Sequence, residues 1–256
     1  MVYSLRLSNS FILRLVATAI LAQLVSTSTA LAHVRPQATS PSSGERLDTP
    51  PAHVVLNYDG AIDPSGSPVV VLDSGGAQVP TITDPVLNNR TASVSPTTDL
   101  AAGPYTVTWT TLDPADGHGA QGFFTFVVSG GPVGIIAGQA QSQAPAADLM
   151  ATLTVTAASD GASLLRVDLD NPAGVERIRI RLSRPDLGED LLDTQTSGDG
   201  GWVLSHDEVA LPGRWHADAI VRRTNIFDDA QASFDFTVDA VTGIPAFATA
   251  QAGGTQ

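Results

Sequence analysis

The chain has 256 residues, enough for one or two domains with a substantial buried core. It carries 13 basic residues, all of them arginine, against 26 acidic residues, for a formal net charge of −13. This balance argues against nucleic acids and anionic bilayers as partners, because both bind through clustered cations. Cysteine is absent and methionine occurs only twice. Any bound metal must therefore be held by nitrogen and oxygen ligands.

The first 32 residues have the layout of a secretory signal peptide. A basic start and an apolar run at 11–24 lead to Ala30-Leu31-Ala32, which has the A-x-A pattern of a cleavage site. An uncleaved membrane anchor is the alternative, but this run is shorter than the roughly 20 residues of a spanning helix, and Arg14 interrupts it. We expect cleavage after Ala32, export to the periplasm or extracellular space, and a mature chain without a membrane span. His33 would then be the amino-terminal residue.

Residues 33–128 have the pattern of a β-sandwich. Short runs rich in β-branched and aromatic residues are separated by turn signals, and proline recurs too often for long helices. The candidate strands are 54–58, 69–72, 105–111 and 123–128. This spacing is typical of a Greek-key sandwich or barrel.

A second set of candidate strands follows a segment at 129–147 that reads as a flexible linker of Gly, Gln, Ala, Ser and Pro. The second domain is expected at 148–239 and a disordered tail at 240–256. The candidate strands of the second domain are 153–156, 164–169, 178–182, 201–205, 215–221 and 234–238. The predicted fold class is all-β, with two Ig-like or cupredoxin-like Greek-key β-sandwich domains joined by a flexible linker and preceded by a cleaved signal peptide.

An arginine stripe marks one predicted strand of the second domain. Arg177, Arg179 and Arg181 alternate with aliphatic residues, which directs the guanidinium groups to one face. An anion site is one interpretation of the stripe. The solvated face of a half-buried strand is the preferred one, because acidic residues are abundant nearby.

The residues with distinctive chemistry lie in the loop before the last strand of the first domain. Side chains at positions i and i+2 of an extended segment point the same way, so Asp116 and His118 can offer a carboxylate and an imidazole to one ion. Gly117 between them allows backbone conformations closed to other residues. An ordinary polar turn is the alternative interpretation, because this tripeptide is common in loops.

Signal cleavage would supply further ligands. An amino-terminal His33 offers its α-amine and its imidazole to the same metal, and the amine has an ordinary pKa of about 7.7–8.0. Together with Asp116 and His118 it would form a set of three nitrogens and one oxygen, which suits tetragonal Cu(II). The alternative is that cleavage leaves an arbitrary first residue, since spacing does not show that residues 85 positions apart meet.

Several motifs of the first domain occur together in an order that resembles the CopC copper-resistance proteins. They are Ala32-His33, Ser40–Gly44, Pro50-Pro51, Val54–Tyr58, Val69–Gly76, Leu100–Trp109 and Asp116–Val127. The resemblance implies an exported β-sandwich that binds Cu(II) through His33, Asp116 and His118. The methionine-rich stretch that gives some members a Cu(I) site is missing, so Cu(I) binding is not expected.

The second domain has a weaker resemblance, at 211–228, to the YtkA-like domain found in fusions of CopC with a copper-transporting membrane domain. A CopD-like membrane copper transporter is accordingly an expected partner. His53, His206 and His216 are each expected to be ordinary surface or packed histidines rather than ligands of a second site.

Three functional classes follow from these observations. The first, which we prefer, is an exported Cu(II) carrier or buffer for copper resistance and homeostasis that is not an enzyme. The second is a redox enzyme with a histidine-brace copper site, which the anionic Asp116 disfavours because it stabilises Cu(II) over Cu(I). The third is a metal-free β-sandwich of the adhesion type.

Overall fold

The structure, a computed structural model, describes residues 34–85, 88–115, 117–130, 136–158, 163–204 and 209–248. Apart from one short 3₁₀ turn, η1 (Pro64–Gly66), the regular structure in these ranges consists of β-strands, which confirms the all-β prediction. None of the described segments forms a helix long and apolar enough to cross a membrane. Contacts place the described residues, which begin at Val34, in one compact unit. We call 34–130 the first module and 136–248 the second module.

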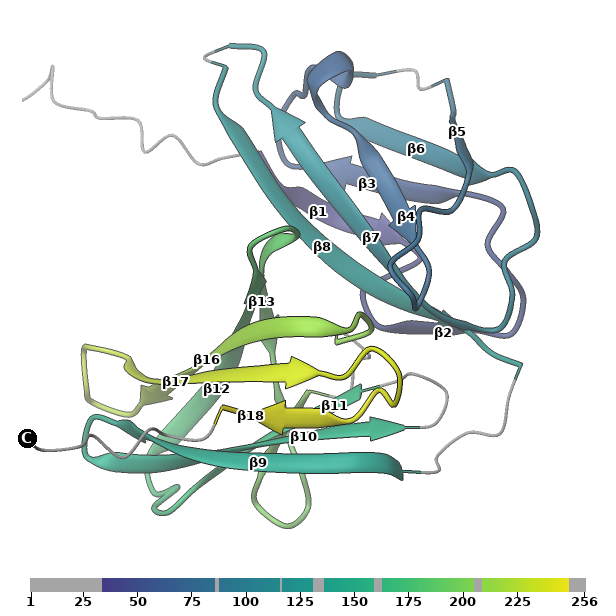
Figure 1. The fold of residues 1–256 in the computed structure, drawn as a ribbon. Helices are drawn as coiled ribbons and strands as arrows, with labels where there is room; N and C mark the ends of the chain where they lie inside the picture. The colour runs from purple at the N-terminus through teal and green to yellow at the C-terminus, as the bar shows by residue number, and fades with distance from the viewer. Residues whose placement is uncertain are drawn as a thin grey trace, which may run out of the picture. The chain divides into compact units, whose positions relative to one another are not determined.

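The first module consists of two four-stranded sheets (Figure 1). One sheet contains β1 (Pro36–Ser40), β3 (Val54–Tyr58), β6 (Thr91–Pro96) and β5 (Thr81–Thr83), in that order. The other contains β2 (Glu45–Leu47), β8 (Gly119–Val128), β7 (Gly103–Leu112) and β4 (Val69–Leu72). Two strands, β3 and β4, have the bounds predicted from sequence, while β7 and β8 extend beyond theirs. The long antiparallel pair of β7 and β8 carries the loop with the candidate ligands.

The core of the first module lies between its two sheets. Leu56 from one sheet, and Val107 and Phe126 from the other, have side chains that are completely buried. The rings of Tyr105 and Phe126 stack with their centroids 5.4 Å apart. Alternate residues of each strand point to this core, as a sandwich requires, so β7 and β8 are firmly held below their connecting loop.

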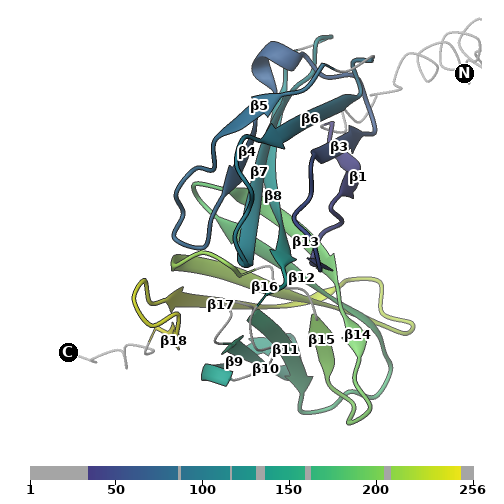
Figure 2. The same cartoon turned by 90° about the vertical axis from the view of Figure 1, so that its right-hand side faces the viewer.

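The second module contains two five-stranded sheets (Figure 2). The first is β14 (Gln195–Thr196), β15 (Trp202–Leu204), β11 (Ser163–Leu169), β10 (Leu149–Ala158) and β9 (Ile136–Ala146). The second is β13 (Gly188–Asp193), β12 (Val175–Arg184), β16 (Gly213–Arg223), β17 (Ala230–Val238) and β18 (Pro245–Phe247). Buried residues from both sheets form one core, so this module is also a sandwich.

The arginine stripe lies on β12, and its preferred interpretation is confirmed. Ile178 and Ile180 are completely buried, whereas Arg177 is exposed. Arg181 lies 3.6 Å from a carboxylate oxygen of Asp218 on the neighbouring strand β16. The strand therefore has one face in the core and one face of guanidinium groups in contact with solvent and acidic residues.

Two predictions about the connecting segments need correction. Residues 136–146, assigned to the linker 129–147, form β9 and pair with β10 along the whole strand. Within the predicted tail 240–256, residues 245–247 form β18 and pair with β17. Both segments are poor in β-branched residues, so their strand conformation comes from pairing with a neighbour rather than from local propensity.

Candidate metal centre

The loop between β7 and β8 is closed by backbone hydrogen bonds. The N–H of Asp113 donates to the oxygen of His118 at 2.8 Å, and the N–H of Gly117 donates to the oxygen of Asp113 at 2.9 Å. Gly117 has a φ of +73°, the left-handed region that favours glycine. His118 is therefore fixed at the base of the hairpin, immediately before β8, with an exposed side chain.

The start of the described chain is attached to the same hairpin. Val34 is 7% exposed, and its oxygen accepts a hydrogen bond of 2.8 Å from Oγ1 of Thr111. Thr111 lies near the end of β7 and pairs with Ala120, two residues after His118. The structure thus brings the segment that begins at Val34 to the end of β7 and β8 that carries the loop.

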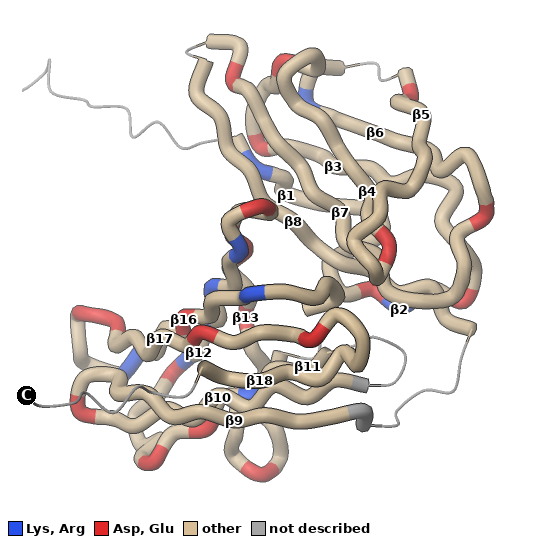
Figure 3. Tube along the Cα trace, viewed as in Figure 1, with Lys and Arg blue, Asp and Glu red and all other residues tan. Residues whose placement is uncertain are grey.

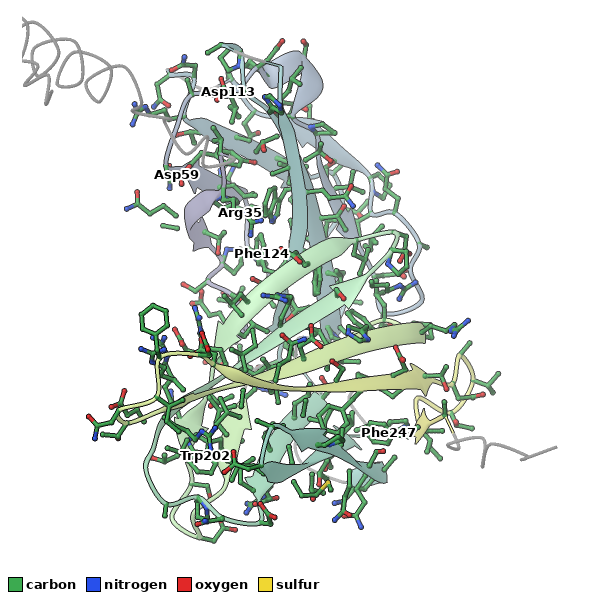
Figure 4. All side chains as sticks on the ribbon, turned by 90° about the vertical axis from the view of Figure 1, so that its left-hand side faces the viewer. Arg35, Asp59, Asp113, Phe124, Trp202 and Phe247 are labelled. Atoms are coloured by element: carbon green, nitrogen blue, oxygen red, sulfur yellow. The ribbon has the colours of Figure 1, made fainter. Side chains whose placement is uncertain are left out.

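Acidic residues lie near this end of the hairpin, among them Asp113 (Figures 3 and 4). The N–H of Asp63 donates to the oxygen of Leu112 at 2.8 Å, which places η1 beside the loop. Hydrogen bonds from the hydroxyl and then the N–H of Ser65 lower the pKa of Asp63. Asp113 accepts a bond of 2.8 Å from the N–H of Ala115. These carboxylates make the surroundings of the loop favourable for a cation.

The three predicted ligands have different outcomes. His118 is at the expected place in the loop, whereas His33 and Asp116 lie outside the described residues. Among the residues that the structure describes, no group of three or more His, Asp or Glu side chains could hold a metal ion. The assignment of His33, Asp116 and His118 to one centre therefore stays a prediction.

Of the remaining histidines, His53 and His216 have carboxylate partners, and His206 lies outside the residues that the structure describes. Nδ1 of His53 lies 3.0 Å from Oδ2 of Asp84, whose other oxygen accepts from Ser95. His216 on β16 is the more distinctive residue, because both of its ring nitrogens face carboxylates.

The imidazole of His216 bridges two acidic residues. Nδ1 lies 2.9 Å from Asp235, and Nε2 lies 3.1 Å from Asp218, which also accepts a bond of 2.6 Å from the hydroxyl of Ser233. Both nitrogens donate only when the ring is protonated. Burial has the largest single effect on the pKa of His216 and lowers it, but the hydrogen bond to Asp235 and the two negative charges together raise the pKa above 6.5. Sequence reasoning missed this cluster because it depends on the register of β16 and β17.

The raised pKa of His216 predicts a pH-dependent stability. A group protonated more strongly in the folded state stabilises the fold fully below its unfolded pKa, about 6.5, and the contribution is lost as pH rises through the folded pKa. The unfolding free energy of the parent should therefore exceed that of His216→Gln most at low pH, and the difference should shrink above about pH 6.5. Urea unfolding at constant salt measures the difference. An NMR titration midpoint for His216 at or below the ordinary value would contradict the prediction.

The first module is thus a two-sheet β-sandwich with a polar, acidic loop at one end of its longest hairpin. Residues 37–129 match the family model of the CopC domain. This confirms the resemblance of the first module, while the YtkA-like resemblance of the second stays a prediction.

Two solved structures are similar to part of the chain. The first is the crystal structure of CopC from Methylosinus trichosporium OB3b, whose sequence is 28% identical to this chain. The alignment covers 38% of this chain and 94% of that protein, with a TM-score of 0.35. PcoC, a methionine-rich copper resistance protein from Escherichia coli, is 22% identical and covers 38% of this chain and 100% of its own, with a TM-score of 0.36. No curated protein matched the chain in sequence.

Proposed function

We propose that the protein is exported and binds Cu(II) as a carrier or buffer in copper resistance and homeostasis. The ligands are the α-amine and imidazole of His33 after cleavage following Ala32, a carboxylate oxygen of Asp116 and the imidazole of His118. The observation that supports this proposal most is the attachment of Val34, the residue after His33, to Thr111 at the end of the β7–β8 hairpin. The match of residues 37–129 to the CopC domain model supports copper as the metal.

The available donor atoms favour Cu(II) over Cu(I). The chain has no cysteine and only two methionines, so it lacks the soft sulfur ligands that select Cu(I). Three nitrogens and one carboxylate oxygen suit the tetragonal geometry of Cu(II). The carboxylates of Asp63 and Asp113 near the loop add a favourable field without being needed as ligands.

Binding, rather than catalysis, is the proposed activity. An anionic Asp116 ligand stabilises Cu(II) and opposes the reduction that oxygen chemistry requires. The loaded protein with a reductant should therefore consume no more oxygen than an equal amount of free copper. Copper would be exchanged with a membrane transporter of the CopD type in the periplasm or at the outer surface of the cell.

The function is tested first through the α-amine. Extending the processed chain by Gly-Ser-Gly-Ser-Gly-Ser before His33 converts the amine into an amide, a poor ligand, and moves the new amino terminus too far along the chain to chelate together with the His33 imidazole. We expect at least about a hundredfold weaker Cu(II) binding, because changes outside the first shell alone often cost ten- to a hundredfold. The measurement is a competition with one chelator at pH 7.5, on proteins whose amino termini have been verified by mass.

The lysine-free sequence offers a matched chemical control. An amine-reactive acylating reagent has only the α-amine to modify in the processed protein, so acylation should have the same effect as the extension. Acylating the extended protein leaves its already weak binding unchanged. Equal affinity of the processed, extended and acylated forms would overturn the proposed site.

A further inference from the structure

We propose that Thr111 is a positioning residue for the copper site, which holds the amino-terminal segment through its hydroxyl group. This inference rests on the proposed function, since it concerns the segment that carries His33. Thr111 is 1% exposed, and its Oγ1 donates a hydrogen bond of 2.8 Å to the oxygen of Val34. The two residues are 77 positions apart, so the bond is a tertiary contact and not part of a local turn.

Two further contacts fix the same segment. A Cβ atom on Gly60 would lie 2.8 Å from Cγ2 of Val34, so the missing side chain of Gly60 leaves the space that Val34 fills. Next along the chain, the N–H of Arg35 donates to the carboxylate of Asp59 at 2.9 Å, and the N–H of Asp59 donates to the oxygen of Arg35 at 3.1 Å (Figure 4). We call these four residues, together with Thr111, the amino-terminal clamp.

The clamp lowers the entropic cost of metal binding. The first residues of a chain are usually poorly ordered, and fixing one residue costs about 1–2 kcal/mol of conformational entropy. Here Val34 is buried by contacts within the protein itself. Thr111 pairs with Ala120 in the strand that begins just after His118. The hydroxyl group of Thr111 therefore links the segment that follows His33 to the β7–β8 pair, whose second strand follows His118.

The test compares Thr111→Val, which keeps the shape of the side chain but removes the hydroxyl, with Thr111→Ser, which keeps the hydroxyl. Both are made in the full processed protein. Loss of one buried hydrogen bond should weaken Cu(II) binding by about tenfold in Thr111→Val, and Thr111→Ser should stay within about threefold of the parent. In the protein with the six-residue extension, Thr111→Val should change the affinity by less than about twofold, because the amine ligand is already lost.

A measurement without copper separates the clamp from the copper site. The Arg35 amide should exchange its hydrogen faster in Thr111→Val than in the parent, and Thr111→Ser should restore the slow exchange. Thermal unfolding verifies that each variant is folded. If Thr111→Val does not fold, Gly60→Ala disturbs Val34 from the opposite side and should weaken Cu(II) binding and speed Arg35 exchange in the same way.

The outcomes are distinguishable. A folded Thr111→Val that binds Cu(II) as tightly as the parent overturns the clamp while the proposed function stands. A parent that binds no Cu(II) overturns the proposed function, and Arg35 exchange then decides the clamp alone. Unchanged exchange in Thr111→Val would overturn it.

Discussion

Replacing His118 with alanine is expected to weaken Cu(II) binding by the processed protein by more than about a hundredfold, since changes that only reorient a ligand already cost ten- to a hundredfold. The backbone of residue 118 accepts a bond from Asp113 and precedes the first ladder pair of β8. Alanine keeps both features, so the loss comes from the imidazole and not from the loop. Chelator competition at pH 7.5 measures the affinity, and EPR should show fewer nitrogen ligands.

A matched histidine makes the result specific. His53 has an exposed side chain and a hydrogen bond to Asp84, in a different part of the same module. His53→Ala should therefore bind Cu(II) as the parent does. If His53→Ala loses tight binding while His118→Ala retains it, the ligand assignment to the β7–β8 loop is wrong.

Replacing Phe126 with alanine should lower the free energy of unfolding of the first module by about 3–5 kcal/mol, the usual range for a buried aromatic side chain. Phe126 is completely buried and stacks on Tyr105 from the neighbouring strand β7. The substitution removes the transfer free energy of the ring and leaves a cavity between the sheets. Urea unfolding of the parent and the variant measures the change, with hydrogen exchange of the β8 amides as the signal for the first module.

The chain contains a matched control for this substitution as well. Phe227 is 89% exposed, so Phe227→Ala should change the free energy of unfolding by less than about 0.5 kcal/mol. A loss below about 1 kcal/mol in Phe126→Ala would mean that the core around this ring collapses to fill the space, contrary to a well-packed sandwich.

The strands that sequence predicted best are those with the strongest local propensity. Val54–Tyr58 and Val69–Leu72 are runs of β-branched and aromatic residues, and the structure has strands with the same bounds. β1, with the sequence Pro-Gln-Ala-Thr-Ser, and β9, rich in Gln and Ala, have no such signal. They are strands because β3 and β10 offer hydrogen-bonding partners, which only the tertiary structure shows.

The candidate site likewise has one part that could be predicted from the sequence and one part that could not. The i, i+2 spacing of Asp116 and His118 was readable from the sequence because it concerns neighbours in one loop. The bond between Thr111 and Val34 was not, because it joins segments far apart in the chain. The same holds for the contact of His216 with Asp235 on β17, whereas its second carboxylate, Asp218, is only two residues away on its own strand.

The short strand β18 lies against β9, an edge strand of the other sheet of the second module. β9 is the last strand of its sheet, and an edge strand offers unpaired N–H and C=O groups that recruit strands from other chains. β18 contacts β9, and the turn before it brings Ile244 so close to Gly138 that a Cβ there would lie 2.8 Å from Cγ2 of Ile244. A segment predicted to lie in a disordered tail thus packs against an edge strand.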